Sequence, residues 1–365
     1  MRIRRFALVL LVAGLATLSR PPQANGQGGA AFDSVKFRNP KKDYQEDRVL
    51  GAVQETAGGI KVTAANKEVT EVAAGNIIAV DYGNLPGMDK IILDLRAAEN
   101  QGNAAKARDL YAAEVKKNPA DPKTKKFLEY REAYWTARTA DEKTGPALQA
   151  EAPAAVAKLI GFVQEYSKKN AWEVWPVAHL AARMQFELGK YTEAGAIYSQ
   201  LAKVEGLPPE MKFDAKLSET EMLFRSGNTL TTAPALEELS KAAGFPTAGS
   251  LREKLTILQA ATKASGEKKP KEKPAAAVKV IDDVIAKTAD PLVRSFGHNI
   301  LGELYTQVDL PREAMWELLR VEVVDNQDHE EVLKAVIRLA ECFQKQGDET
   351  RAKAYHDKLA QVKGA

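Results

Sequence analysis

One spacing of small and apolar residues occurs twice near the C-terminus and constrains the fold more than any other feature. Gly302 and Ala340 each follow a leucine, and the two leucines lie 38 positions apart (339 minus 301). Each small residue is followed by an aromatic residue, an alanine and an apolar residue at matching offsets, namely Tyr305, Ala314 and Val321, and then Phe343, Ala352 and Leu359. A period of this length is typical of a helical hairpin that stacks on its neighbours to bury its apolar faces.

The residue types at these positions suit closely stacked helices. The small residues beside the leucines let two helices touch, because no bulky side chain separates them. Gly189 and Gly347 fall where the chain would turn between helices, and a positive φ costs glycine little there. Pro119 and Pro208 would end second helices, since proline lacks the amide hydrogen that a helix interior needs. The sequence therefore predicts a run of helical hairpins.

Two earlier stretches repeat the pattern, one from Ala181 to Leu201 and one from Gly102 to Pro119. By this spacing the chain resembles the tetratricopeptide-repeat (TPR) family over residues 87–365. Within that family it resembles an exported bacterial TPR-containing protein. The resemblance implies a mainly α fold, an α-solenoid of TPR-like helical hairpins. The repeat of 38 residues (339 minus 301) is longer than the family's unit of about 34. The family's tryptophan at the fourth position is also absent, so an α-solenoid of another kind is the alternative.

Residues 44–86 follow a different period and predict a small all-β module ahead of the helices. Apolar and polar residues alternate there, as in half-buried strands. The predicted strands are Asp47–Val53, Ile60–Thr63, Lys67–Val72 and Ile77–Tyr82. The pattern resembles small SH3-like or Sm-like barrels. We expect a module of this size to lean on the helical array and to dock on it or cap it.

The first residues predict export. Arginines lie within residues 1–5, an apolar run covers 6–18, and proline and small residues follow. This order is typical of a secretory signal peptide, here 1–24, cleaved after Ala16 or Ala24. The apolar run is short for a membrane span, although an uncleaved anchor is the alternative. A flexible tether over 25–43 follows. We expect a periplasmic or secreted protein that is not transmembrane once the signal is removed.

The charge balance argues against nucleic acid as a partner. The whole chain carries +3, and the predicted signal peptide contains four arginines, which leaves 3 − 4 = −1. A nearly neutral chain offers no electrostatic attraction to a phosphate backbone. One Lys/Pro-rich stretch, 263–274, lacks apolar periodicity and predicts a solvated flexible loop. Contact with an anionic surface is the alternative for that loop.

The sequence contains no motif for catalysis or for holding a metal. It has no phosphate-binding glycine loop, no nucleophile elbow and no paired-cysteine motif, so we expect no enzyme, cofactor or metal site. Cys342 lies in an apolar helical pattern and is expected to be a buried small hydrophobe. The acidic run of Asp325, Asp328, Glu330 and Glu331 lacks the central glycine of a calcium loop. It predicts a helix-start cap and a solvated face.

The TPR resemblance also implies where binding would occur. In TPR arrays the first helix of each hairpin lines a concave groove. Transferred to this sequence, the resemblance implies a protein-binding groove made by His179, Arg183, Phe186, Glu187, Leu217, Glu221, Phe224, Arg225, Asn299, Glu303, Gln307, Lys334, Glu341 and Lys345. This mixture of charged, amide and aromatic groups suits an extended peptide. The alternative is that these residues form only a solvated helix face.

These observations predict a non-enzymatic protein–protein interaction scaffold in the cell envelope, which binds a protein or peptide in the groove. A second hypothesis is a cell-envelope binding module, in which the β module and the Lys/Pro-rich loop contact a glycan or lipid surface and the array is a spacer. Salt would disrupt that contact. A third hypothesis is an enzyme whose site has no recognised motif.

Overall fold

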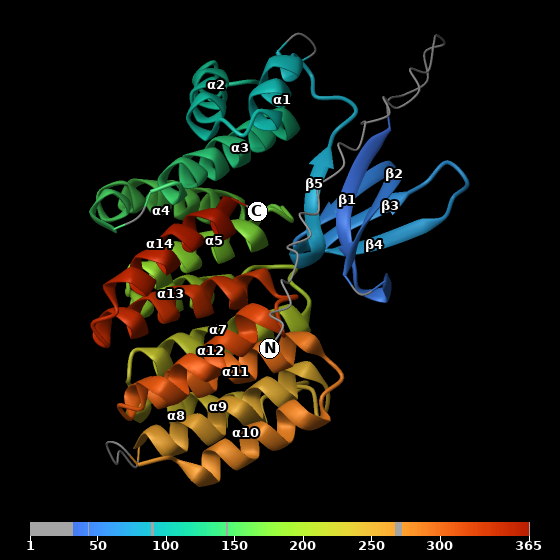
Figure 1. The fold of residues 1–365 in the computed structure, drawn as a ribbon. Helices are drawn as coiled ribbons and strands as arrows, with labels where there is room; N and C mark the ends of the chain where they lie inside the picture. Colours follow the sequence, from blue (N-terminus) through green and yellow to red (C-terminus); the bar gives the residue numbers. More distant parts are fainter. Residues whose placement is uncertain (1–31, 43, 89–90, 144, 267–271, 365) are drawn as a thin grey trace, which may run out of the picture. The chain divides into compact units, whose positions relative to one another are not determined.

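The computed structural model describes residues 32–364, apart from 43, 89–90, 144 and 267–271. The predicted signal peptide, the first part of the predicted tether (25–31) and the centre of the Lys/Pro-rich loop lie outside the described residues. Within them, a small sheet is followed by helices to the C-terminus (Figure 1). The predicted order, an all-β module followed by a mainly α array, is confirmed.

The sheet has five antiparallel strands in the order β4-β3-β2-β1-β5. The strands are β1 (Asp33–Asn39), β2 (Gln45–Thr56), β3 (Gly59–Thr63), β4 (Val69–Ala73) and β5 (Ile77–Asp81). Two short 3-10 turns, η1 (Pro40–Lys42) and η2 (Ala74–Asn76), lie within this region. All four strands expected from alternation are present.

Strand β1 corrects the predicted tether. The prediction of flexible chain over 25–43 is wrong for 33–39, which lie inside the sheet between β2 and β5. Val35 and Phe37 alternate with polar residues and are buried, which is the period of a half-buried strand. The sheet would be cut in two without β1, because β2 and β5 both pair with it.

Fourteen helices follow among the described residues. They are α1 (Ile92–Asn100), α2 (Ala104–Lys116), α3 (Pro122–Asp141), α4 (Gly145–Tyr166), α5 (Val174–Glu187), α6 (Tyr191–Leu201), α7 (Pro209–Arg225), α8 (Thr229–Lys241), α9 (Ser250–Gly266), α10 (Ala275–Lys287), α11 (Pro291–Gln307), α12 (Pro311–Val323), α13 (His329–Lys345) and α14 (Glu349–Gly364). Helix α9 runs to Gly266, so the loop predicted from 263 begins later. Ser265 is buried there, and its hydroxyl donates to Gln307. No described helix is long and apolar enough to cross a membrane.

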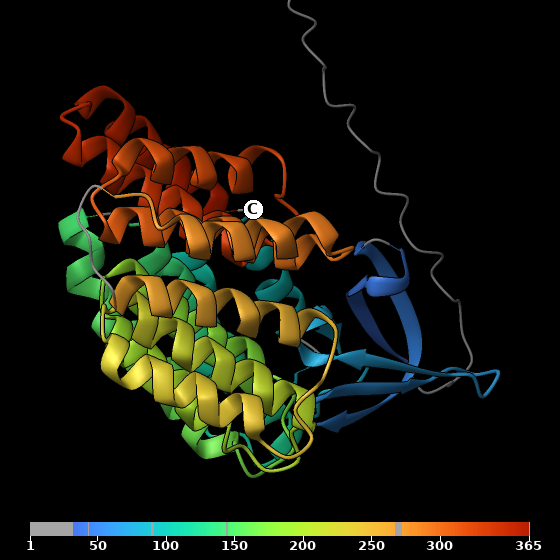
Figure 2. The ribbon, with the colours of Figure 1, turned by 90° about the horizontal axis from the view of Figure 1, so that it is seen from below.

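The helices form hairpins, as the spacing predicts, and the hairpins stack side by side (Figure 2). Gly302 lies where α11 meets α12, and a Cβ added there would come within 2.8 Å of the Leu318 side chain. Gly189 and Gly347 have φ of 71° and 74° in the turns after α5 and α13. Ala314 is fully buried. Cys342 is also buried, as predicted, and burial raises the pKa of its thiol.

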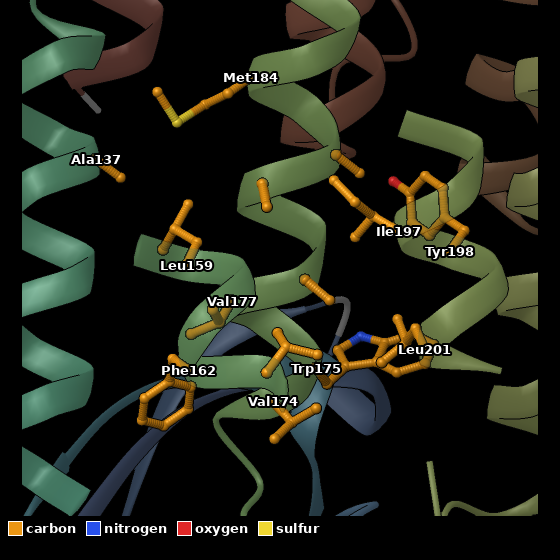
Figure 3. Close-up of a cluster of buried hydrophobic side chains, with 14 of the residues drawn as sticks. Ala137, Leu159, Phe162, Val174, Trp175, Val177, Met184, Ile197, Tyr198 and Leu201 are labelled. Atoms are coloured by element: carbon orange, nitrogen blue, oxygen red, sulfur yellow. The ribbon is translucent and has the colours of Figure 1, made fainter. Parts of the chain in front are cut away.

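The largest hydrophobic core joins helices and sheet. Side chains from α3, α4, α5 and α6 interleave around Val177 and Leu159 (Figure 3). Val35 and Ile60 of the sheet belong to the same core. A Cβ added at Gly58 would come within 2.5 Å of Pro208, so the turn between β2 and β3 lies directly against the start of α7. The β module therefore docks on the helical array.

Candidate functional site

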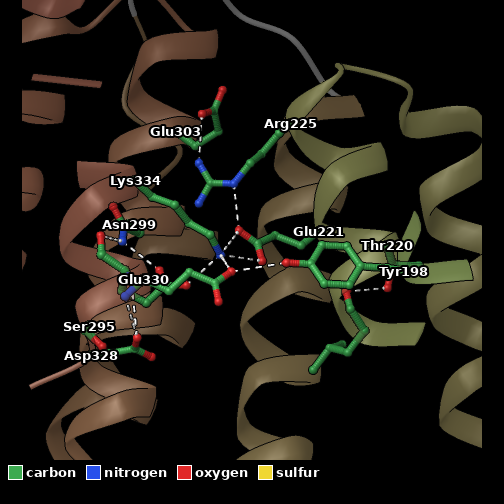
Figure 4. Close-up of polar contacts among 12 residues, drawn as sticks. Tyr198, Thr220, Glu221, Arg225, Ser295, Asn299, Glu303, Asp328, Glu330 and Lys334 are labelled. Carbon is green, nitrogen blue, oxygen red and sulfur yellow. Dashed lines mark hydrogen bonds and ion pairs between the residues drawn. The ribbon is translucent and has the colours of Figure 1, made fainter. Parts of the chain in front are cut away.

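The predicted groove residues lie on α5, α7, α11 and α13, the first helices of four hairpins. These helices face one another, and their charged side chains meet in the interior (Figure 4). On α7, Arg225 donates to Glu221 at 2.7 Å and to Glu303 of α11 at 3.1 Å. Arg338 of α13 pairs with the same Glu303 at 2.6 Å. One carboxylate therefore joins three helices.

Lys334 of α13 is the second centre of this network. Its Nζ lies 3.1 Å from both carboxylate oxygens of Glu221 and 2.7 Å from Glu331. Asn299 of α11 donates to the backbone carbonyl of Glu331 at 2.9 Å and to its carboxylate at 2.6 Å. Lys334, Glu221 and Glu331 are all less than a tenth exposed.

Burial and pairing act in opposite directions on these groups. Burial acts to raise the pKa of Glu221, but Lys334 and Arg225 outweigh it and the pKa is lowered. The pKa of Glu331 is raised, because burial and the nearby Glu221 exceed the effect of Lys334. Buried charges are tolerated only when they are paired in this way. We infer that the network holds the inner helices in one register.

A second charged cluster connects the last helix to α3 and α5. Arg183 of α5 pairs with Asp141 at the end of α3, and Lys363 of α14 pairs with Glu187 of α5. Lys363 also lies 3.9 Å from Asp141, and Arg138 of α3 donates to the backbone carbonyl of Lys363. The last helix therefore meets α3 and α5, and α13 also contacts α5.

The structure buries most of the predicted groove residues. Those less than a tenth exposed are Phe186, Leu217, Glu221, Phe224, Arg225, Asn299, Glu303 and Lys334. The side chains of Arg183 and Glu187 are 11% and 7% exposed. His179, Gln307 and Glu341 are partly exposed, and Lys345 is exposed. The middle of the predicted groove is filled by its own side chains, and peptide binding by these residues stays a prediction.

An open cavity of about 500 Å³ lies at the end of this interior that faces the β module. We call it the mouth; it is lined by η2 and by residues of α5, α7, α9, α11 and α13. Trp175, Met211 and Phe296 supply apolar wall. Two lysines and five carboxylates also line the mouth, so the formal charge of its lining is 2 − 5 = −3. The lysines are Lys254 and Lys334, and the carboxylates are Asp214, Glu221, Asp328, Glu330 and Glu331.

Glu330 is the best-positioned carboxylate of the mouth. It accepts a hydrogen bond from the hydroxyl of Tyr198 at 3.1 Å, and His179 Nδ1 lies 3.2 Å from its other oxygen. Burial acts to raise its pKa, but Lys334 and the bonds from His179 and Tyr198 hold it well below its usual range. Glu330 is therefore a fixed negative charge, and its side chain is one-third exposed.

Reasoning from sequence missed several of these residues. The solvated face predicted for the acidic run is wrong for Glu331 and Asp325, which are buried and paired, the latter with Arg294 at 2.8 Å. The predicted cap is correct, because Asp328 accepts from the amides of Glu330 and Glu331. The sequence does contain one signal of this buried network. Glu331, Lys334 and Arg338 recur at three- and four-residue spacing, so they share one face of α13, and apolar residues lie between them.

Comparison with known proteins adds one finding. No family model matches the chain. No curated protein sequence matches it. A solved tetratricopeptide repeat protein from Parabacteroides merdae is similar, with 13% identity and a TM-score of 0.43, over 76% of this chain and 98% of that one. The hairpins and their glycine turns define the class of this chain: a TPR-like α-solenoid with a small all-β module. Among the described residues, no group of three or more His, Cys, Asp or Glu could hold a metal ion.

Proposed function

We propose that this chain is a non-enzymatic protein-interaction scaffold of the cell envelope, and that the mouth binds an extended, basic segment of a partner protein. The observation that carries the proposal is the mouth itself, an open cavity with apolar wall and a carboxylate excess. Extended segments are held in such places by apolar anchors and polar contacts. The envelope location rests on the N-terminal residues, whose order is that of a secretory signal peptide.

The charges of the mouth favour a cationic partner. Lys334 is already paired with Glu221 and Glu331, which are both buried. It also lies 3.7 Å from Glu330, whose side chain stays one-third exposed, so a ligand would meet Asp214, Asp328 and the exposed part of Glu330. Lys254 lies among them, and its pKa is raised by Asp214 and Asp328 against the effect of its burial. A lysine or arginine side chain of a partner would be attracted by the same carboxylates. Complementary charge of this kind speeds association and selects partners.

The test is site-specific photocrosslinking in the native envelope fraction. A benzophenone amino acid would replace Met211, which lines the mouth, and in a control Leu230, which is 88% exposed on α8. The expected result is one defined protein adduct from position 211 that an excess of an Arg-rich peptide removes. Equal adducts from both positions, or none from position 211, would contradict the proposal.

The alternative envelope-surface module has less support. On the exposed side of the sheet, Lys61 of β3 pairs with Glu71 of β4 at 2.7 Å, which neutralises the positive charge that an anionic surface would need. The centre of the Lys/Pro-rich loop lies outside the described residues. In the crosslinking experiment, this hypothesis would yield envelope lipid or glycan material and no protein adduct.

A further inference from the structure

A second cavity, separate from the mouth, lies between β5 and helices α1, α2 and α3. Its volume is about 320 Å³, at the lower end of the range for small-ligand sites. Five aromatic rings line it, from Tyr82, Tyr111, Phe127, Tyr130 and Trp172. The proposed function makes no use of this cavity.

The rings are arranged edge to face. Tyr82 and Phe127 have centroids 6.0 Å apart at 89°, and Tyr111 and Phe127 are 6.2 Å apart at 70°. Tyr130 and Trp172 lie 5.8 Å apart at 66°. Aromatic faces carry partial negative charge, so a cation placed over the face of one of these rings is attracted to it.

Cations of the chain already use these rings. Lys123 Nζ lies 4.3 Å from the centroid of Tyr82, and the guanidinium of Arg131 lies about 6 Å from Tyr111 and from Tyr130. Arg131 is itself held by Glu99, to which its Nε donates at 2.8 Å. The ring cluster is therefore an environment in which positive charge is stabilised.

The charges around the cavity do not balance. Lys126 is the one ammonium between two carboxylates: it pairs with Glu55 and, at 2.9 Å, with Glu173. Glu173 lines the cavity and is fully buried. The other ion pairs of the wall are Arg131 with Glu99, and Arg96 with Asp81 at 3.5 Å. The charged residues that line the cavity are Arg96 and Arg131 against Asp81, Glu99 and Glu173, which gives 2 − 3 = −1.

We infer that this cavity binds a small organic cation of the alkylated ammonium class, carrying one positive charge. A single charge would balance the carboxylate excess, and the rings would contact the alkyl groups. A metal ion fits less well, because no group of three or more His, Cys, Asp or Glu side chains among the described residues could hold one. Buried surroundings also make a cation–π contact stronger than it is in water.

The test is calorimetric titration of the full chain with choline at pH 8, beside its uncharged carbon isostere 3,3-dimethylbutan-1-ol. The two probes have the same shape and differ in charge. The expected result is saturable one-site binding of choline, and binding of the isostere that is weaker by about tenfold or more. No saturable binding of choline, or equal binding of both probes, would overturn the inference. This comparison needs no substitution.

Matched variants locate the binding. Phe127→Leu should weaken choline binding by about tenfold. Phe213→Leu changes a ring of α7 that contacts Phe245, away from this cavity, and should leave binding unchanged. Glu173→Gln should weaken binding, and Glu165→Gln, at an exposed carboxylate, should not. Circular dichroism melts would show that each variant is folded. Folded variants of Phe127 and Glu173 that bind like the unsubstituted chain would overturn the assignment to this cavity.

Discussion

Glu221 of α7 and Lys334 of α13 lie 113 positions apart in the sequence, yet both oxygens of the carboxylate are 3.1 Å from the ammonium nitrogen. The two side chains are 4% and 7% exposed. The pair therefore connects hairpins that are distant in the sequence. Any other register between the inner helices would leave a buried charge unpaired, which is why such pairs favour one arrangement.

Removing one partner of this pair should be costly. Lys334→Met keeps the bulk of the side chain and leaves Glu221 and Glu331 without their shared cation. Loss of a buried partner destabilises by about 3–5 kcal/mol, because the remaining charge is uncompensated. Urea denaturation followed by circular dichroism measures the change in the free energy of unfolding.

Two further variants serve as controls for Lys334→Met. Lys345→Met, at an exposed lysine of the same helix, should stay within about 0.5 kcal/mol of the unsubstituted chain. Adding Glu331→Gln to Lys334→Met should recover part of the loss, since one unpaired carboxylate is removed. If Lys334→Met were as stable as Lys345→Met, the network would contribute nothing to the fold.

The hairpins could be predicted from sequence because each depends on local spacing. Gly302 marks a close contact between two helices, and Gly347 marks a turn. Both involve neighbours within one repeat, so the pattern is visible in a single stretch of chain. Strand β1 is not evident from the sequence, because Val35 and Phe37 give only a short alternation that begins soon after the Gly/Gln/Ala run of 25–31.

The candidate site could be predicted only in part. The residue positions implied by the TPR resemblance are on the inner helices, as expected, but their burial depends on how far the array curves. That curvature brings Arg225 to Glu303 and Lys363 to Glu187, over separations of 78 and 176 residues. No local pattern encodes such distances. The mouth and the cavity between β5 and helices α1, α2 and α3 could not be predicted for the same reason, since each combines residues from the sheet region and from several helices.

The contact between the last helix and α5 gives a second prediction. Lys363→Met removes the cation that pairs with Glu187 and approaches Asp141, so two buried carboxylates lose a partner. The end of α14 should then detach more often, and its backbone amides should exchange with solvent about tenfold faster. Hydrogen exchange with mass spectrometry measures this rate. Lys353→Met, at an exposed lysine of α14, should leave it unchanged; equal rates in both variants would contradict the proposed contact.

Glu173 gives a pH dependence of stability. Burial raises the pKa of this carboxyl from 4.5 to about 7, despite the opposing effect of Lys126. The folded chain thus holds the proton more tightly than the unfolded chain does. The resulting stabilisation is complete below about pH 4.5 and is lost as the pH rises through 7. For this shift in pKa, the free energy of unfolding should fall by about 3 kcal/mol over that range.

Glu173→Gln should remove the part of that slope that Glu173 causes, because glutamine does not titrate. Glu187 and Glu331, whose pKa values burial also raises, keep their own contributions. Urea denaturation at several pH values between 4.5 and 7 measures the slope. Glu165→Gln should retain it: the hydrogen bond from Lys169 lowers the pKa of Glu165, so that group titrates below this window. A Glu173→Gln variant with the unsubstituted slope would show that another group causes the dependence.

Two glycine substitutions test whether close helix contact explains the repeated spacing. At Gly302 a Cβ would lie 2.8 Å from two atoms of Leu318, so Gly302→Ala should destabilise by about 1–3 kcal/mol through overpacking. At Gly161 of α4 a Cβ would meet nothing within 4 Å, so Gly161→Ala should stabilise by about 0.5–1 kcal/mol, because alanine is the better helix former. The same chemical change should therefore lower the stability of the chain at one site and raise it at the other.

Thermal melts of both glycine variants measure the difference in stability. Leu318→Val should relieve part of the destabilisation in Gly302→Ala, because the smaller side chain leaves room for the added Cβ. Stabilisation at both positions would mean that helix propensity, and not contact between α11 and α12, decides the residue at 302.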